Sequence, residues 1–132
     1  MIKRFKLVRC MTCGRKDNIH KIVRIAKRKK DKVIIVLDNK KPFGVITLSD
    51  IVFKAVASGR NMRKIKAEEI ASKDIYYLDE KEDECKAYMY MLTRNHLFCS
   101  ITRNEKFIGL LNLSDLIKKS VADHCSRIKR KK

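Results

Sequence analysis

The sequence contains the same unit twice. Segment 33–53 aligns with segment 98–118 without a gap, and six of the 21 aligned positions are identical. Gly44 recurs as Gly109, an offset of 65 positions, so two units of about this length nearly fill the chain of 132 residues. An internal repeat of this kind predicts that the fold is built from two copies of one supersecondary unit.

Both copies predict the same order of elements. Runs of β-branched and apolar residues favour buried strands, and apolar residues spaced three and four positions apart favour an amphipathic helix. The elements expected in the first and second copies are a helix at 19–26 and 85–92, a strand at 33–37 and 97–102, and a second strand at 43–47 and 107–111. A further helix is expected to start at Ser49 or Ser114, because a serine side chain can cap the first-turn amides. Gly59 is expected to end the first of these helices.

A short motif opens the last helix of each copy. It reads Gly-x-x-Thr-Leu-Ser-Asp at 44–50 and Gly-x-x-Asn-Leu-Ser-Asp at 109–115. In this context the two copies resemble the cystathionine-β-synthase (CBS) domain, whose units occur in tandem and dock as a pair called the Bateman module. The resemblance implies an α/β (α+β) fold of two β-α-β-β-α units packed as a pseudo-two-fold pair. The expected divisions are a first unit at 7–59, a second unit at 65–122 and a basic C-terminal tail at 123–132.

The resemblance also implies a function. Tandem CBS pairs bind AMP, ADP or ATP, and less commonly S-adenosylmethionine, in clefts between their units. A stand-alone pair is therefore expected to be a regulatory or energy-sensing module that acts on a partner, without catalytic activity or a cofactor of its own. Family members commonly dimerise through their helix faces, so a homodimer is expected.

The motif residues are the expected ligand contacts. Carried over by position, Thr47 and Asp50 would serve the first cleft, and Asp115 the second. A carboxylate can accept hydrogen bonds from both hydroxyls of a ribose, and helix-start amides favour a phosphate oxygen. Asn112 stands where the family prefers threonine or serine, which makes the first cleft the stronger candidate. Both aspartates could instead simply cap their helices. The residues expected to line the adenine ends are Met11, Thr12, Cys13, Ile75, Tyr76 and Tyr77.

The net charge of +18 is concentrated in one half of the chain. Residues 1–66 hold 20 basic and 4 acidic side chains, whereas residues 67–132 hold 13 and 11. This asymmetry predicts an anionic partner, a nucleic acid or an acidic protein, for the basic first repeat and the tail. The alternative function is therefore a basic nucleic-acid-associated protein that uses the CBS scaffold with non-functional clefts. The sequence contains no recognised nucleic-acid-binding motif.

Cysteine and histidine residues offer a second alternative. Cys10 and Cys13 have the spacing of zinc ligands, and His124 and Cys125 could complete a set of four. Reduced thiols packed as small apolar groups are the favoured interpretation of the five cysteines, because an odd number does not fit a disulfide framework. The three histidines are scattered, and none adjoins a nucleophile in a catalytic motif.

The apolar segments of the sequence are short. The longest unbroken apolar run is 33–37, whereas a membrane helix needs about 20 residues. The charged start of the chain is not followed by the apolar stretch of a secretory signal. A cytoplasmic protein without a membrane partner is expected.

Overall fold

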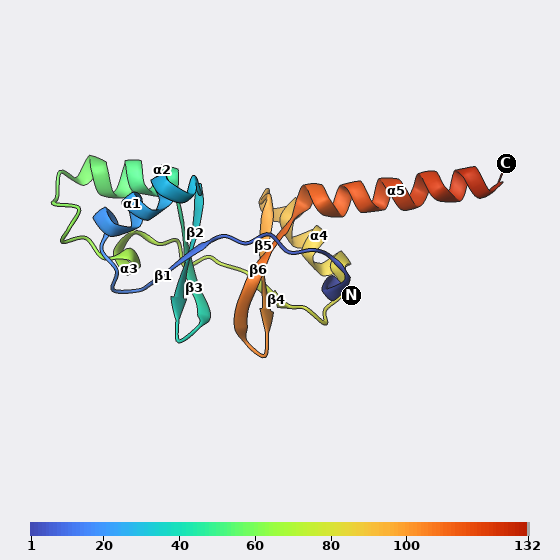
Figure 1. The fold of residues 1–132 in the computed structure, drawn as a ribbon, viewed down its shortest axis with the longest axis horizontal. Coiled ribbons are helices and arrows are strands. Elements are labelled where there is room, and N and C mark those ends of the chain that lie inside the picture. The colour runs from blue at the N-terminus through green and yellow to red at the C-terminus, as the bar shows by residue number, and fades with distance from the viewer. Residues whose placement is uncertain (132) are drawn as a thin grey trace.

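The computed structural model describes the backbone of residues 1–131 and the side chains of residues 1–129. Two units of the same architecture lie side by side (Figure 1). Each contains a three-stranded sheet, ordered β1-β2-β3 in the first unit and β4-β5-β6 in the second. The first two strands of each sheet are parallel and the last two are antiparallel. The predicted mixed α and β fold of two repeated units is confirmed.

The elements follow the predicted order. The first unit contains β1 (Met11–Gly14), α1 (Ile19–Lys29), β2 (Val33–Asp38), β3 (Lys41–Thr47), α2 (Leu48–Asp50), η2 (Ile51–Ala55), η3 (Val56–Ser58) and α3 (Ala67–Ile70). The second contains β4 (Tyr77–Asp79), α4 (Glu84–Arg94), β5 (Phe98–Arg103), β6 (Lys106–Asn112) and α5 (Leu113–Lys131). A short helix, η1 (Ile2–Arg4), begins the chain.

Burial explains the apolar runs. Ile34, Ile35 and Val36 are completely buried, because β2 lies between β1 and β3 and both of its faces are covered. In α1, Ile19 and Ile22 face the core, whereas Lys21 between them and Arg24 after them face solvent. In the first unit, therefore, the continuous apolar run marks the central strand, and the periodic one marks the helix.

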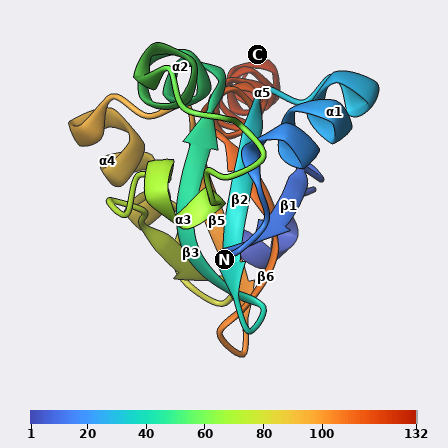
Figure 2. The same ribbon diagram turned by 90° about the vertical axis from the view of Figure 1, so that its left-hand side faces the viewer.

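The hairpin turns explain why an asparagine is repeated. Asn39 and Lys40 have φ values of 48° and 68°, and Asn104 and Glu105 have values of 51° and 68°. Two successive residues with positive φ form the tight turn that suits antiparallel strands, and asparagine tolerates this conformation well. Both turns lie at one edge of the molecule, opposite α1, α2 and α5 (Figure 1 and Figure 2). Lys41 Nζ lies 3.1 Å from a Glu105 carboxylate oxygen and so links the two turns.

The helix after β3 begins before the predicted residue. Its N-cap is Thr47 and not Ser49, because Thr47 is still extended and its side chain accepts a hydrogen bond from the Asp50 amide. In the second unit α5 already begins at Leu113, so Ser114 lies inside the helix. Gly59 ends η3 with a φ of 72°, as predicted.

The two units exchange their leading segments. Ile2 is completely buried in the hydrophobic core of the second unit, although it precedes the first. The Ile2 amide donates to the Glu82 carbonyl at 2.9 Å, and the Lys3 amide donates to the Glu80 carbonyl at 2.7 Å. From this anchor beside α4, the chain crosses to β1 in the other unit (Figure 1).

The linking segment makes the reciprocal exchange. Ile65, Ala67 and Ile70 lie in the core of the first unit. Ser72 then pairs with Val45 of β3 through two backbone hydrogen bonds of 2.9 and 3.0 Å. Each hydrophobic core therefore includes residues outside the predicted bounds of its unit, which were 7–59 for the first unit and 65–122 for the second.

The predicted basic tail is helical in its described part. Helix α5 continues through Lys131 and projects beyond the body of the molecule (Figure 1). Side chains at 121–129 are exposed, and Lys132 lies outside the described residues. Within the described residues, no helix has both the length and the apolar character needed to cross a membrane.

Candidate functional site

The carboxylate of Asp50 is fully engaged by its own helix turn. Its Oδ2 accepts hydrogen bonds from the Thr47 amide at 2.9 Å and from the Thr47 hydroxyl at 3.1 Å. Its Oδ1 lies 3.1 Å from Lys54 Nζ. These contacts form a capping box closed by an ion pair one turn along the helix. In this conformation Asp50 would have to give up at least one partner to bind a ligand.

The equivalent Asp115 has different surroundings. It lines a cavity of about 470 Å³ together with Lys6, Leu7, Val8 and Arg9. No described side chain forms a hydrogen bond or an ion pair with its carboxylate. This cavity therefore combines an available carboxylate, two cations and two apolar side chains, and it brings the motif of the second unit to the leading segment of the chain.

The motif glycine makes this approach possible. Val8 and Leu110 exchange two backbone hydrogen bonds of 2.8 and 2.9 Å, which hold the leading segment against β6. A Cβ atom on Gly109 would lie 3.0 Å from Leu7 Cβ and 3.2 Å from the Val8 carbonyl oxygen, and its φ of 155° also disfavours a side chain. The sequence motif by itself gave no indication that the leading segment packs on this glycine.

Gly44 has the same role in the first unit. A Cβ atom there would lie 2.8 Å from the Ser72 carbonyl oxygen and 3.0 Å from Ala71 Cβ. The recurrence of this glycine in the repeat was the sequence signal for these contacts. In both units the glycine lies on the strand against which the exchanged segment packs.

The residues expected at the adenine ends are dispersed. Met11 and Cys13 face inward from β1 and are occupied by core packing, whereas Thr12 between them is exposed. Tyr76 stacks on Tyr90 with ring centroids 4.2 Å apart. Ile75 is half-buried, and Tyr77 is exposed. Asn112, which occupies the motif position of Thr47 in the second unit, is half-buried. None of these side chains lines the cavity that contains Asp115.

The proposed zinc ligands are not brought together. Burial raises the pKa of the Cys10 thiol to about 11 and that of Cys13 to about 12, which opposes the thiolate form that binds metal. His124 and Cys125 lie on the part of α5 that projects from the second unit. Among the described residues, no group of three or more histidine, cysteine or acidic side chains could hold a metal ion.

Sequence comparisons give a limited result. No protein-family model matches the sequence. An uncharacterized protein of Methanopyrus kandleri is 28% identical over 86 residues, which cover 64% of this chain and 44% of that protein. The chain therefore spans less than half the length of this relative.

Structural comparisons define the class of fold. A conserved CBS domain protein of Thermoplasma acidophilum superimposes with a TM-score of 0.71 at 14% identity, over 89% of this chain and 67% of that one. Hypoxic Response Protein I, solved with two coordinated zinc ions, gives 0.76 at 18% identity over 89% and 97%. The cytosolic domain of the Mg²⁺ channel MgtE, solved with ATP, gives 0.71 at 16% identity over 83% and 44%.

These likenesses confirm the predicted architecture. The chain is a pair of repeated α+β units with exchanged leading segments. It has the fold of a tandem CBS-domain pair, the Bateman module.

Proposed function

We propose that this chain is a regulatory module that binds an adenosine nucleotide in the cavity lined by Asp115. The observation that carries the proposal is the composition of this cavity, in which Asp115 faces Lys6, Leu7, Val8 and Arg9. A structure of similar fold was solved with ATP, which supports the choice of ligand class.

Each group in the cavity suits one part of a nucleotide. The Asp115 carboxylate would accept from the two ribose hydroxyls. Lys6 and Arg9 would pair with the phosphates, and Leu7 and Val8 would contact the base. The two cations favour AMP, ADP or ATP over an uncharged adenosine ligand or S-adenosylmethionine. The alternative with non-functional clefts is not favoured, because this cavity keeps the groups that a nucleotide needs.

Regulation would follow from the position of the cavity between the exchanged segment and the motif of the second unit. A ligand held by Asp115 and Arg9 together would favour the arrangement in which these groups lie close. Such a ligand shifts the population of two packings of the units toward the one that it binds better. The regulated partner would respond to that difference.

The test compares the same substitution in the two units. For the parent protein we expect AMP, ADP or ATP at about a hundredfold its dissociation constant to add about 2.7 kcal/mol to the free energy of unfolding, seen as a rise in Tm. D115N should weaken nucleotide binding by about tenfold to a hundredfold, because an amide cannot replace a carboxylate that accepts from two hydroxyls. D50N should leave the affinity within about twofold and cost only about 1 kcal/mol of stability through its cap.

GTP and calorimetry complete this experiment. An equal response to GTP would show binding of polyphosphate by charge alone and would overturn the adenosine assignment. Titration calorimetry of both variants decides between the clefts. If D50N abolishes binding and D115N does not, the first cleft is the site.

We also propose that a second copy of the chain covers the helix face of the first unit. Val52, Phe53 and Val56 are exposed there, and Phe53 keeps 74% of its surface accessible. Beside them, a hollow of about 450 Å³ between α1 and α2 is lined mainly by apolar surface, including Val23 and Leu48. A group of exposed apolar side chains beside an apolar hollow is typical of a protein–protein interface.

Phe53→Glu tests the dimer. We expect the parent to have the mass of a dimer in light scattering and F53E to shift to a monomer, because a buried glutamate would lack a partner. Asn61→Asp is the matched control, since it adds the same negative charge on an exposed loop and keeps the acceptor for the Arg63 amide. A parent that is monomeric at all concentrations would exclude this interface.

A further inference from the structure

Three arginines on and beside the outer face of α1 have no acidic partner among the described residues. Among the described ion pairs, Lys21 reaches Asp17 at 3.4 Å, but none engages Arg24, Arg28 or Arg63. Several other arginines are paired: Arg103 lies 2.7 Å from Glu80, and Arg15 lies 3.2 Å from both Asp38 and Glu68. The positive charge of the first unit is therefore not neutralised evenly, and part of the uncompensated charge lies on and beside this helix.

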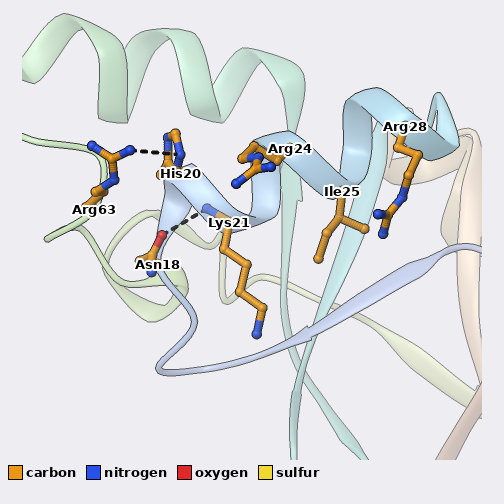
Figure 3. Close-up of a pocket in the computed structure, with 7 residues that line it drawn as sticks. All are labelled: Asn18, His20, Lys21, Arg24, Ile25, Arg28 and Arg63. Carbon is orange, nitrogen blue, oxygen red and sulfur yellow. Dashed lines mark hydrogen bonds between the residues drawn. The ribbon is translucent and has the colours of Figure 1, made fainter.

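These cations surround one hollow. It has a volume of about 380 Å³, and its lining contains no carboxylate. The residues that line it are Asn18, His20, Lys21, Arg24, Ile25, Arg28 and Arg63. Figure 3 shows Lys21 and Arg28 extending from the same side of α1, while Arg63 reaches His20 from the segment that follows η3.

Two contacts hold the hollow in place. Arg63 Nη2 lies 3.4 Å from His20 Nε2, and His20 must accept because a guanidinium only donates. The Asn18 side chain accepts from the Lys21 amide at 2.9 Å and fixes the start of the helix. The cations are therefore displayed on a rigid element, which lowers the entropy lost when they bind an anion.

The face is too long for one small anion. From His20 to Arg28 the helix rises about 12 Å at 1.5 Å per residue. Lys27, Lys30 and Lys32 do not belong to this row of cations, because they line the hollow beside Val23 and Leu48. A row of this length suits a polymer of phosphates better than a single phosphate group.

The face also lacks what a protein interface needs. Protein partners bind through buried aromatic or aliphatic anchors, whereas the hollow offers only the half-buried Ile25. No phenylalanine, tyrosine or tryptophan lines it, so the hollow offers bases little stacking surface beyond the His20 ring. A phosphate backbone needs neither feature, because its affinity comes from charge and counterion release.

We infer that the α1 face, formed by Lys21, Arg24, Arg28 and Arg63, binds the phosphodiester backbone of a nucleic acid without reading its sequence. This activity is separate from the proposed nucleotide site, which lies at Asp115. The two surfaces would allow one chain to contact a nucleic acid while its cavity holds a nucleotide.

The test measures binding of the full chain to a labelled single-stranded RNA of about 20 nucleotides from about 50 to 200 mM salt. The triple variant R24Q/R28Q/R63Q should lower the slope of log affinity against log salt by about 2, at about 0.7 per lost phosphate contact. It should also weaken binding about tenfold or more near 150 mM salt. The control K118Q/K119Q/R127Q removes three positive charges from α5 and should change the affinity by less than about threefold, because charges this far from the hollow act only through the screened net field.

Several results would overturn the inference. These are a parent that does not bind RNA, a flat salt response, or an equal loss in the control variant, which would assign binding to net charge alone. Tighter binding to vesicles of anionic lipid at equal phosphate concentration would assign the face to a membrane surface. D115N should leave RNA binding unchanged, so failure of the nucleotide proposal and failure of this one are distinguishable.

Discussion

Gly44→Ala is expected to lower the free energy of unfolding by about 2–3 kcal/mol, a large loss for the addition of one methyl group. The new Cβ atom would lie 2.8 Å from the Ser72 carbonyl oxygen. That oxygen accepts a hydrogen bond from the Val45 amide at 3.0 Å, so it cannot move away without breaking the pairing of the exchanged segment. Urea unfolding followed by circular dichroism measures the loss.

Gly14→Ala is the matched control. A Cβ atom on Gly14 would make only an ordinary contact of 3.5 Å with the Asp17 side chain, and the backbone there has no unusual conformation. We expect a change within about 0.5 kcal/mol. If both variants lose the same small amount, the linking segment does not pack on β3 as described, and the explanation of the repeated glycine fails.

Local patterns were sufficient to predict most of the architecture. The apolar run 33–37 became β2, a central strand whose two faces are both buried, and the periodic residues near Ile22 became the buried face of α1. The exchange of leading segments could not be predicted. Ile2 and Ile65 are apolar in the sequence, but nothing local determines which of two similar cores each one joins.

The site was predictable only in part, for a related reason. The repeat places Asp50 and Asp115 at equivalent positions, and a lysine follows each of them four residues later, at Lys54 and Lys119. Only the first aspartate is engaged by such a lysine in the described structure. Thr47 also donates its hydroxyl to Asp50, and Asn112 makes no corresponding contact among the described hydrogen bonds. Which carboxylate remains available in this conformation depends on these side-chain arrangements, which the motif alone does not determine.

Ile2→Ala is expected to cost about 2–4 kcal/mol of stability, although the residue stands second in the chain. Terminal residues usually tolerate truncation because they are poorly ordered, but Ile2 is completely buried against the core that contains Met91 and Leu111. Removing its side chain would leave a cavity that the backbone cannot close, since the Ile2 and Lys3 amides are hydrogen-bonded to the segment before α4. Urea unfolding, with amide exchange of the second unit, measures the effect.

Ile117→Ala makes the same change at a half-exposed position on α5 of the same unit, and we expect it to alter stability by less than about 1 kcal/mol. The comparison tests the exchange directly. Ile2→Ala should lower the stability more than Ile117→Ala only if the leading segment forms part of the second core. Equal losses would mean that the segment before β1 adds nothing to that core. The cavity at Asp115 depends on the same segment through Lys6 and Arg9, so a loosened Ile2 variant should also bind nucleotide more weakly. Stability of the second unit and occupancy of its cavity are therefore linked through one stretch of chain.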